Sequence, residues 1–154
     1  MSFSVITEDG ELRKHAKTPS PAMLTTLFGQ QATTRVAVEW GDMRGIISGY
    51  GLTHDGWNTV KRNPAGACVL AALGAEPSVV AGPVVFTGWD TARDEPAPLR
   101  EWALTVVADI YVAVDNALAG LASGHGQPWD AAVFRMGHIV KNFATPLIIL
   151  ENFQ

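Results

Sequence analysis

The chain has 154 residues, of which 47% are hydrophobic and 17% are charged, and its formal net charge at pH 7 is −4. This length fits one domain with a sizeable core, and the acidic balance argues against a protein that binds duplex DNA by neutralising phosphates. A chain so poor in charge leaves apolar surface to be covered, which favours a homo-oligomer.

The N-terminal segment predicts a short strand and then a capped helix. Residues 3–7 can form a strand, and Asp9-Gly10 after it is a tight-turn signal. Residues 11–15 are then either the return strand of a hairpin or a polar loop. Ser20-Pro21 is a typical helix start, and apolar residues at helical spacing predict a helix over 21–28.

A pair of antiparallel strands is predicted next. Residues 33–40 alternate in polarity, with Val36, Val38 and Trp40 on one face, and the strand itself is placed at 36–40. Gly41-Asp42 is predicted to turn the chain, so that residues 43–48 pair back as a second strand. The glycine-spaced stretch that follows, 49–57, is predicted to be a loop.

Asn63-Pro64 predicts the start of a second helix over 64–73. An asparagine side chain accepts hydrogen bonds from the free N–H groups of a first turn, and proline presets the helical φ. Loss of such a cap costs about 1 kcal/mol. Gly74 stands where a glycine ends a helix, and the β-branched run after it predicts a buried strand, placed at 83–88.

The longest predicted element is an amphipathic helix over 99–122. A charged connector with two prolines precedes it at 91–99. Apolar side chains then keep a 3.6-residue period through the helix. The opposite side carries little charge apart from Asp109 and Asp115, so it is predicted to be a second contact surface, a dimer seam. The seam is assigned to Thr105, Ala108, Val112 and Ala119.

The remaining residues predict a last helix at 130–143 and a final strand at 147–153 that adds to the sheet. Taken together, the elements predict a single α+β domain over 1–154. In it, a small, mainly antiparallel sheet is covered by helices and a long C-terminal amphipathic helix. Residues 91–154 form a helical extension of the α+β part at 1–90.

The stretch 51–63 is the predicted ligand site. A histidine next to a carboxylate can be held as a general base or ligand holder, and basic residues before a helix start lie where free N–H groups attract anions. The alternative is a solvated loop whose charges face water. The predicted ligand-binding residues are His54, Asp55, Trp57, Lys61, Arg62 and Asn63.

The tryptophans allow two interpretations. Trp40, Trp57 and Trp89 fall in or beside the loop-and-strand region, where they either line one groove or belong largely to the core.

The sequence contains no recognisable catalytic constellation. It lacks a nucleophile elbow, a dinucleotide or phosphate loop and a histidine pair at metal-ligand spacing. We therefore expect a protein that is not an enzyme and needs no cofactor or metal. The single cysteine, Cys68, is predicted to be a small buried hydrophobe in a reducing cytoplasm. Without a signal peptide pattern or about 18 uninterrupted apolar residues, no membrane span is expected.

Residues 3–90 resemble a known family. The resemblance rests on the helix turn Met23-Leu24 with Leu27-Phe28-Gly29, the two short strands, the helix opened by Asn63-Pro64, and the strand Ala81-Gly82-Pro83-Val84-Val85-Phe86-Thr87-Gly88. In these features the chain is similar to the domain-of-unknown-function 3846 family, which occurs in bacteriophages, conjugative plasmids and actinobacterial chromosomes. The resemblance implies a cytoplasmic accessory protein of a mobile element, carries no catalytic residues, and leaves out residues 91–154.

Two functions from different classes follow. The leading prediction is a non-enzymatic accessory binding protein of a mobile element, anti-defence or regulatory in role, that acts on a protein partner from the host or the element. The alternative is a small-ligand or nucleotide-binding protein, with hydrolysis as an option, whose site lies around 51–63. Convergence of His54 and Lys61 on one pocket would favour the alternative.

Overall fold

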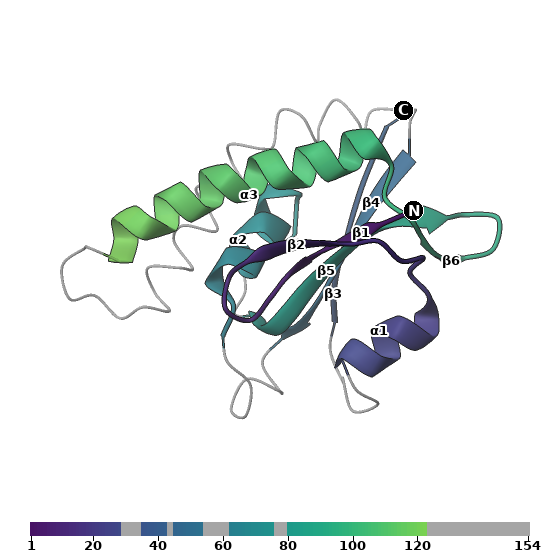
Figure 1. Cartoon of the computed structure of the whole chain (residues 1–154), viewed down its shortest axis with the longest axis horizontal. Coiled ribbons are helices and arrows are strands. Elements are labelled where there is room, and N and C mark those ends of the chain that lie inside the picture. The colour runs from purple at the N-terminus through teal and green to yellow at the C-terminus, as the bar shows by residue number, and fades with distance from the viewer. Residues whose placement is uncertain (29–34, 43–44, 54–61, 76–79, 123–154) are drawn as a thin grey trace.

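An antiparallel sheet forms the centre of the fold. The computed structural model describes residues 1–28, 35–42, 45–53, 62–75 and 80–122 (Figure 1). Its strands are β1 (Phe3–Ile6), β2 (Leu12–His15), β3 (Arg35–Asp42), β4 (Gly45–Thr53), β5 (Val80–Asp90) and β6 (Glu95–Ala97). They lie in the order β2-β1-β5-β4-β3, and β6 pairs with the end of β5.

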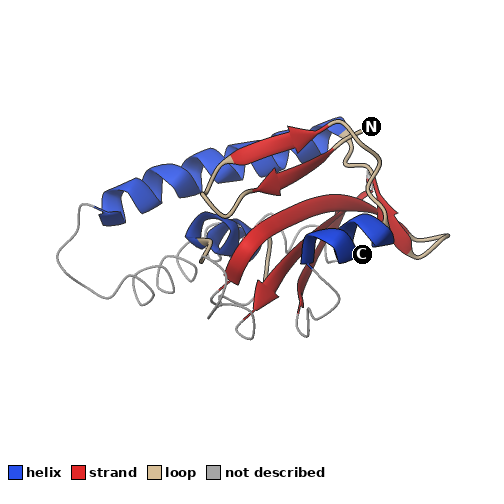
Figure 2. Ribbon diagram, turned by 60° about the horizontal axis from the view of Figure 1, so that its bottom comes forward, coloured by secondary structure: helices blue, strands red, loops and turns tan. Residues whose placement is uncertain are grey.

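Helices cover both faces of this sheet, as Figure 2 shows. They are α1 (Pro21–Phe28), α2 (Pro64–Ala72) and α3 (Glu101–Ala122). The larger core joins α2 and α3 to side chains of three strands, including Ile6, Ile47 and Phe86. The smaller core, on the other face, joins α1 to Phe3, Val5, Tyr50 and Val85. The predicted α+β class, with its mainly antiparallel sheet and long helix, is confirmed.

The β1–β2 hairpin confirms a return strand within residues 11–15. Gly10 has a φ of +86°, a conformation that glycine adopts without strain. The N–H of Thr7 donates to the carbonyl of Glu11, and the N–H of Gly10 donates to the carbonyl of Thr7, both at 2.8 Å. The polarity of β2 fits its position at one end of the strand order, where Arg13 and Lys14 are exposed.

Both predicted helix starts are confirmed. In α1 the hydroxyl of Ser20 accepts from the N–H of Met23 at 3.1 Å. In α2 the side-chain oxygen of Asn63 accepts from the N–H of Gly66 at 2.9 Å, with Pro64 at the first helical position. These are side-chain N-caps, in which an orphan N–H of the first turn gains an acceptor.

The end of α2 also follows the prediction. Gly74 has a φ of +117°. Its N–H donates to the carbonyl of Ala71 at 3.0 Å, and the N–H of Ala75 donates to the carbonyl of Leu70 at 3.0 Å. This pair of bonds is the glycine-dependent helix ending that satisfies carbonyls of the last turn.

The predicted loop at 49–57 is wrong for residues 49–53, which continue strand β4. The glycines in this stretch allow close packing. A Cβ on Gly49 would lie 2.5 Å from Cδ2 of Leu70 in α2, and a Cβ on Gly51 would lie 2.9 Å from Cγ1 of Val80. Small residues here let the helix approach the sheet, so their spacing reflects packing and not a turn.

The predicted turn at Gly41-Asp42 is wrong as well. Both residues pair within the β3–β4 ladder, Gly41 with Ile46 and Asp42 with Gly45. The described part of β4 begins at Gly45, while residues 43 and 44 of the predicted strand lie outside the described residues. The strand prediction for this region is confirmed, with the boundaries shifted by pairing that local turn propensity does not reveal.

The predicted connector at 91–99 contains a strand. A carboxylate oxygen of Asp90 accepts from the N–H of Ala92 at 3.0 Å and from the N–H of Arg93 at 3.2 Å. This turn brings β6 back onto β5, where Pro96 pairs with Trp89. Proline is compatible with a strand of this kind because β6 pairs only at the end of β5 and has few ladder bonds to lose.

The long helix predicted over 99–122 is confirmed by α3. Its buried stripe belongs to the larger core and consists of Ala103, Val107, Val114 and Leu118. By length and composition alone, Glu101–Ala119 is also suited to cross a membrane, with a mean hydropathy of 1.4. In this fold the buried stripe packs on α2 and β1, and 22% of the apolar window is buried. The predicted helix at 130–143 and strand at 147–153 lie outside the described residues.

Candidate functional site

Most of the ligand site predicted at 51–63 falls on residues that the structure does not describe. His54, Asp55, Trp57 and Lys61 lie outside the described ranges. Arg62 is half-buried, and its backbone bridges to Ala81 of β5. The predicted convergence of His54 and Lys61 on one pocket therefore stays a prediction.

Asn63, the last of the predicted ligand-binding residues, lies in the interior and connects three segments of the fold. Its side chain is 0% exposed. The amide nitrogen donates to the carbonyls of Ile6 at 3.1 Å, Thr7 at 3.0 Å and Gly82 at 2.9 Å, while the amide oxygen caps α2. One side chain thus ties the end of β1, the strand β5 and the start of α2 together.

The carbonyl of Gly82 needs this donor because β5 is irregular there. Between Tyr50 and Leu52 of β4, the pairing partner on β5 moves from Val85 to Ala81, which is the register shift of a bulge. Gly82 lies inside the bulge with a φ of +74°. The buried side chain of Asn63 thus helps to hold the fold together, and its predicted ligand-binding role stays a prediction.

Cys68 is buried in α2, as predicted. Burial raises the pKa of its thiol from 9.0 to about 12. A thiol with this pKa is protonated at neutral pH, and the thiolate is the nucleophilic form. Cys68 is therefore a packing residue of the helix.

The predicted dimer seam lies on the outward side of α3. Thr105 and Ala119 are exposed, Ala108 is half-buried, and Val112 is 56% exposed. Asp109 and Asp115 are exposed on the same helix. The structure thus places these side chains away from the core but does not show what contacts them.

Tyr111, half-buried in α3, connects this helix to the β1–β2 hairpin. Its hydroxyl donates to the carbonyl of Gly10, 101 positions earlier in the chain. Burial raises the pKa of Tyr111 above 10.0, and the negative charges of Asp115 and Glu11 raise it further. The neutral hydroxyl is therefore the form that the fold favours.

We expect this hydroxyl to make stability depend on pH in the alkaline range. Because the folded-state pKa of Tyr111 is raised, its contribution is fully present below the unfolded value of 10.0 and is lost as the pH rises through the folded value. Tyr111→Phe should lower the urea midpoint at neutral pH and make its alkaline decline shallower than in the wild type. Parallel declines in the two proteins would contradict this assignment.

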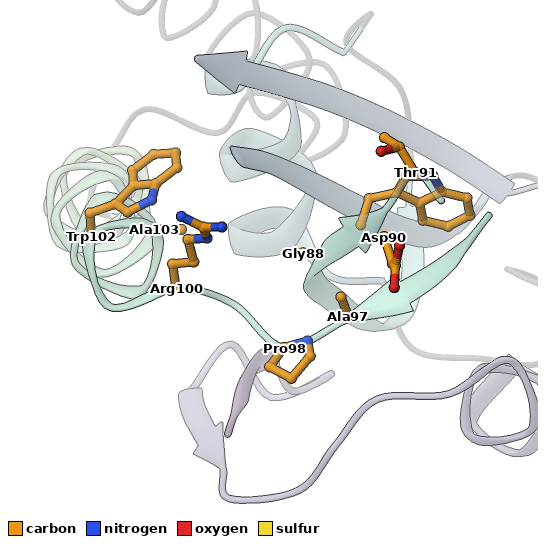
Figure 3. A pocket seen from close by; sticks show the side chains of 9 residues that line it. Gly88, Asp90, Thr91, Ala97, Pro98, Arg100, Trp102 and Ala103 are labelled. Carbon is orange, nitrogen blue, oxygen red and sulfur yellow. The ribbon is translucent and has the colours of Figure 1, made fainter. Parts of the chain in front are cut away.

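A cavity of about 310 Å³ lies where β5, β6 and α3 meet (Figure 3). Two indoles line it, Trp89 near the end of β5 and Trp102 in the first turn of α3. The backbones come close together here, because a Cβ on Gly88 would lie 2.5 Å from the carbonyl oxygen of Pro98. The volume is at the lower end of the range of small-molecule sites, which is roughly 300–1,000 Å³.

Charges of both signs face this cavity. Arg100 precedes α3 and is exposed, and Asp90 ends β5 and is half-buried. Figure 3 shows Arg100 and Trp102 on one side of the cavity, with Asp90 and Thr91 on the other. Among the described residues, no ion pair joins Asp90 to Arg100. The cavity therefore presents a positive and a negative group on opposite sides, and two indoles contribute to its lining.

A second cavity, of about 440 Å³, lies between the β1–β2 hairpin and α1. Its lining combines the apolar side chains of Phe3, Met23 and Leu27 with polar ones. The imidazole of His15 stacks on the ring of Phe3, with centroids 5.1 Å apart. Lys17 contributes to the lining of this cavity, and the described lining residues include no carboxylate.

Sequence reasoning identified one member of the first cavity and missed the rest. Trp89 was predicted either to line a groove with Trp40 and Trp57 or to be core; it lines a cavity with Trp102 instead. The side chains of Trp40 and Trp57 are not described by the structure. The only local signal for the site was the turn after Asp90, which brings β6 and the start of α3 beside the end of β5.

Among the described residues, no group of three or more His, Cys, Asp or Glu side chains is arranged to hold a metal ion. A scan against protein-family models gives no match, and no curated protein or solved structure shows significant similarity to the chain. The function must therefore be argued from the surface and cavities of this chain alone.

Proposed function

We propose that the protein is a non-enzymatic binding module that pairs with a second copy through the outward side of α3 and acts, as an assembled unit, on a protein partner. The observation that supports this is the composition of that side. Val112 is 56% exposed at its middle. Thr105, Ala108 and Ala119 on the same side are small, Asp109 and Asp115 lie beside Val112, and no basic residue occurs in α3. A solvated helix face normally carries more charge.

The spacing of the seam residues suits a second copy. Thr105, Ala108, Val112 and Ala119 fall at intervals of three, four and seven, the pattern by which one helix meets another along its length. Small side chains at such positions let two helices approach closely. A symmetric pair uses the same patch twice, so one stripe is enough to close a dimer.

The biological setting of the proposal comes from the family resemblance of residues 3–90. In that setting the module serves a mobile element, in an anti-defence or regulatory role, and its partner is a host or element-encoded protein. The proposal includes no catalytic step. Its support is the charge-poor side of α3, which carries Asp109 and Asp115 but no basic residue. A dimer seam there leaves the sheet and its cavities available for other contacts.

Val112→Asp tests the seam. We expect the variant to fold like the wild type, because the side chain is outside the core, but to dissociate at least about tenfold more readily, because dimerisation would bury a new carboxylate. Light scattering after size exclusion and sedimentation velocity measure the mass in solution. Added salt should strengthen the wild-type dimer, because Asp109 and Asp115 of both copies meet in one seam.

Ala113→Asp is the matched control. Ala113 is also exposed and lies about 100° around the helix from Val112. The substitution therefore adds the same charge to the same turn but on another side of the helix. It should leave the dimer intact. A wild-type protein that sediments as a monomer at high micromolar concentration would overturn the proposal, and flotation of the wild type with lipid vesicles would assign the stripe to a membrane surface instead.

A further inference from the structure

We propose that the cavity between β5, β6 and α3 binds a small zwitterion of the size of an α-amino acid with an apolar side chain. This cavity is separate from the outward stripe of α3, so the proposal does not depend on dimer formation. Its volume of about 310 Å³ admits one small molecule.

Arg100 provides the anion-binding group. Its side chain is exposed at the cavity, and it forms no ion pair with the described carboxylates. A guanidinium presents N–H groups in a planar fork that matches the two oxygens of a carboxylate. Arg93 lies in the turn that follows Asp90. Its side chain pairs with Glu95 at 3.8 Å and does not line the cavity.

Asp90 provides the cation-binding group on the opposite side (Figure 3). Two backbone N–H groups, those of Ala92 and Arg93, donate to one of its oxygens and fix the carboxylate at the end of β5. The other carboxylate oxygen is not used in that turn and can accept from an ammonium group. A ligand with an ammonium and a carboxylate thus meets both charges at once, which neither a simple anion nor a simple cation does.

Trp89 and Trp102 provide the apolar part of the site. Both are half-buried, and they reach the cavity from different elements. Indole rings offer a large apolar area, and their faces attract cations such as an ammonium group. The close approach of Gly88 to Pro98 narrows the floor and limits the ligand to a small side chain or a single ring. The second cavity lacks the opposed charges and does not share this specificity.

The experiment compares ligands that differ in one charge. Leucine, leucinamide, which lacks the carboxylate, and N-acetyl-leucine, which lacks the ammonium, are titrated into the full chain by calorimetry at low salt. We expect leucine to bind more tightly than either derivative. Arg100→Gln should lower the affinity for leucine at least about tenfold and leave the affinity for leucinamide unchanged. Asp90→Asn should lower the affinity for leucine and leave the affinity for N-acetyl-leucine unchanged.

Arg93→Gln is the matched control, since it removes a nearby exposed cation from outside the cavity. It should leave all three affinities as in the wild type. Asp90→Asn keeps a side-chain oxygen that can accept in the turn. Melting temperatures equal to that of the wild type would confirm that the variants fold. The proposal is overturned if leucine, methionine and phenylalanine all fail to bind at millimolar concentration, or if Arg93→Gln lowers affinity as much as Arg100→Gln.

Discussion

Replacing Asn63 with alanine is expected to lower the free energy of unfolding by about 3–5 kcal/mol. The helix cap alone accounts for about 1 kcal/mol of this loss. The rest arises because the carbonyls of Ile6 and Gly82 are left in the interior without their donor. Urea unfolding followed by circular dichroism measures the change, and an effect of only about 1 kcal/mol would show that capping is the sole role.

Asn63→Asp separates the two roles of this side chain. Aspartate caps helices as well as asparagine does, so a pure cap would tolerate it. In this position, however, a carboxylate cannot donate and would face the carbonyl oxygens of Ile6, Thr7 and Gly82. We expect it to destabilise the protein at least as much as alanine. Ser20→Ala, which removes only the cap of α1, is the control and should cost about 1 kcal/mol.

Gly66→Ala is the second substitution with a large expected effect, about 2–4 kcal/mol of destabilisation. Helix propensity alone predicts the opposite, since alanine is favoured over glycine in a helix by about 1 kcal/mol. The added Cβ would lie 2.9 Å from Cβ of Val84 and 3.0 Å from the amide nitrogen of Asn63. Val84 is fully buried in β5 and its branched side chain has little freedom to move.

The double variant Gly66→Ala/Val84→Ala provides the test of this cause. Removing the methyl groups of Val84 relieves part of the overlap, so the double variant should be more stable than the sum of the two single effects. Thermal and urea unfolding measure all four proteins of the cycle. A Gly66→Ala protein more stable than the wild type would mean that α2 can move away from the sheet.

The features that could be predicted from sequence are those with local causes. Asn63-Pro64 and Gly74 act within one turn of α2, and the hairpin turn at Gly10 needs only a positive φ. The 3.6-residue period of apolar side chains, which continues along α3, indicates the face that this helix buries. In each case the residues that determine the structure are neighbours in the chain, so a pattern read along the sequence contains the information.

The features that could not be predicted depend on residues far apart in the chain. Gly49 and Gly51 resemble loop residues until α2 lies against them. The strand β6 has three residues and exists through its pairing with β5. The cavity needs Trp89 and Trp102 together, which the turn after Asp90 and the return of the chain bring about. No periodicity or spacing marks these contacts in advance.

The position of β1 in the sheet affects how the protein folds during its synthesis. This strand is synthesised long before β5, yet in the finished sheet it lies between β2 and β5. Its end is bonded to Asn63, Ser2 just before it accepts from the N–H of Leu99, and the hairpin after it receives Tyr111. Closing such long loops is slow. The nascent chain therefore carries a β1–β2 hairpin whose apolar strand lacks its other neighbour until β5 and α3 have emerged. The time that the chain spends in that state sets its exposure to aggregation and its need for chaperones.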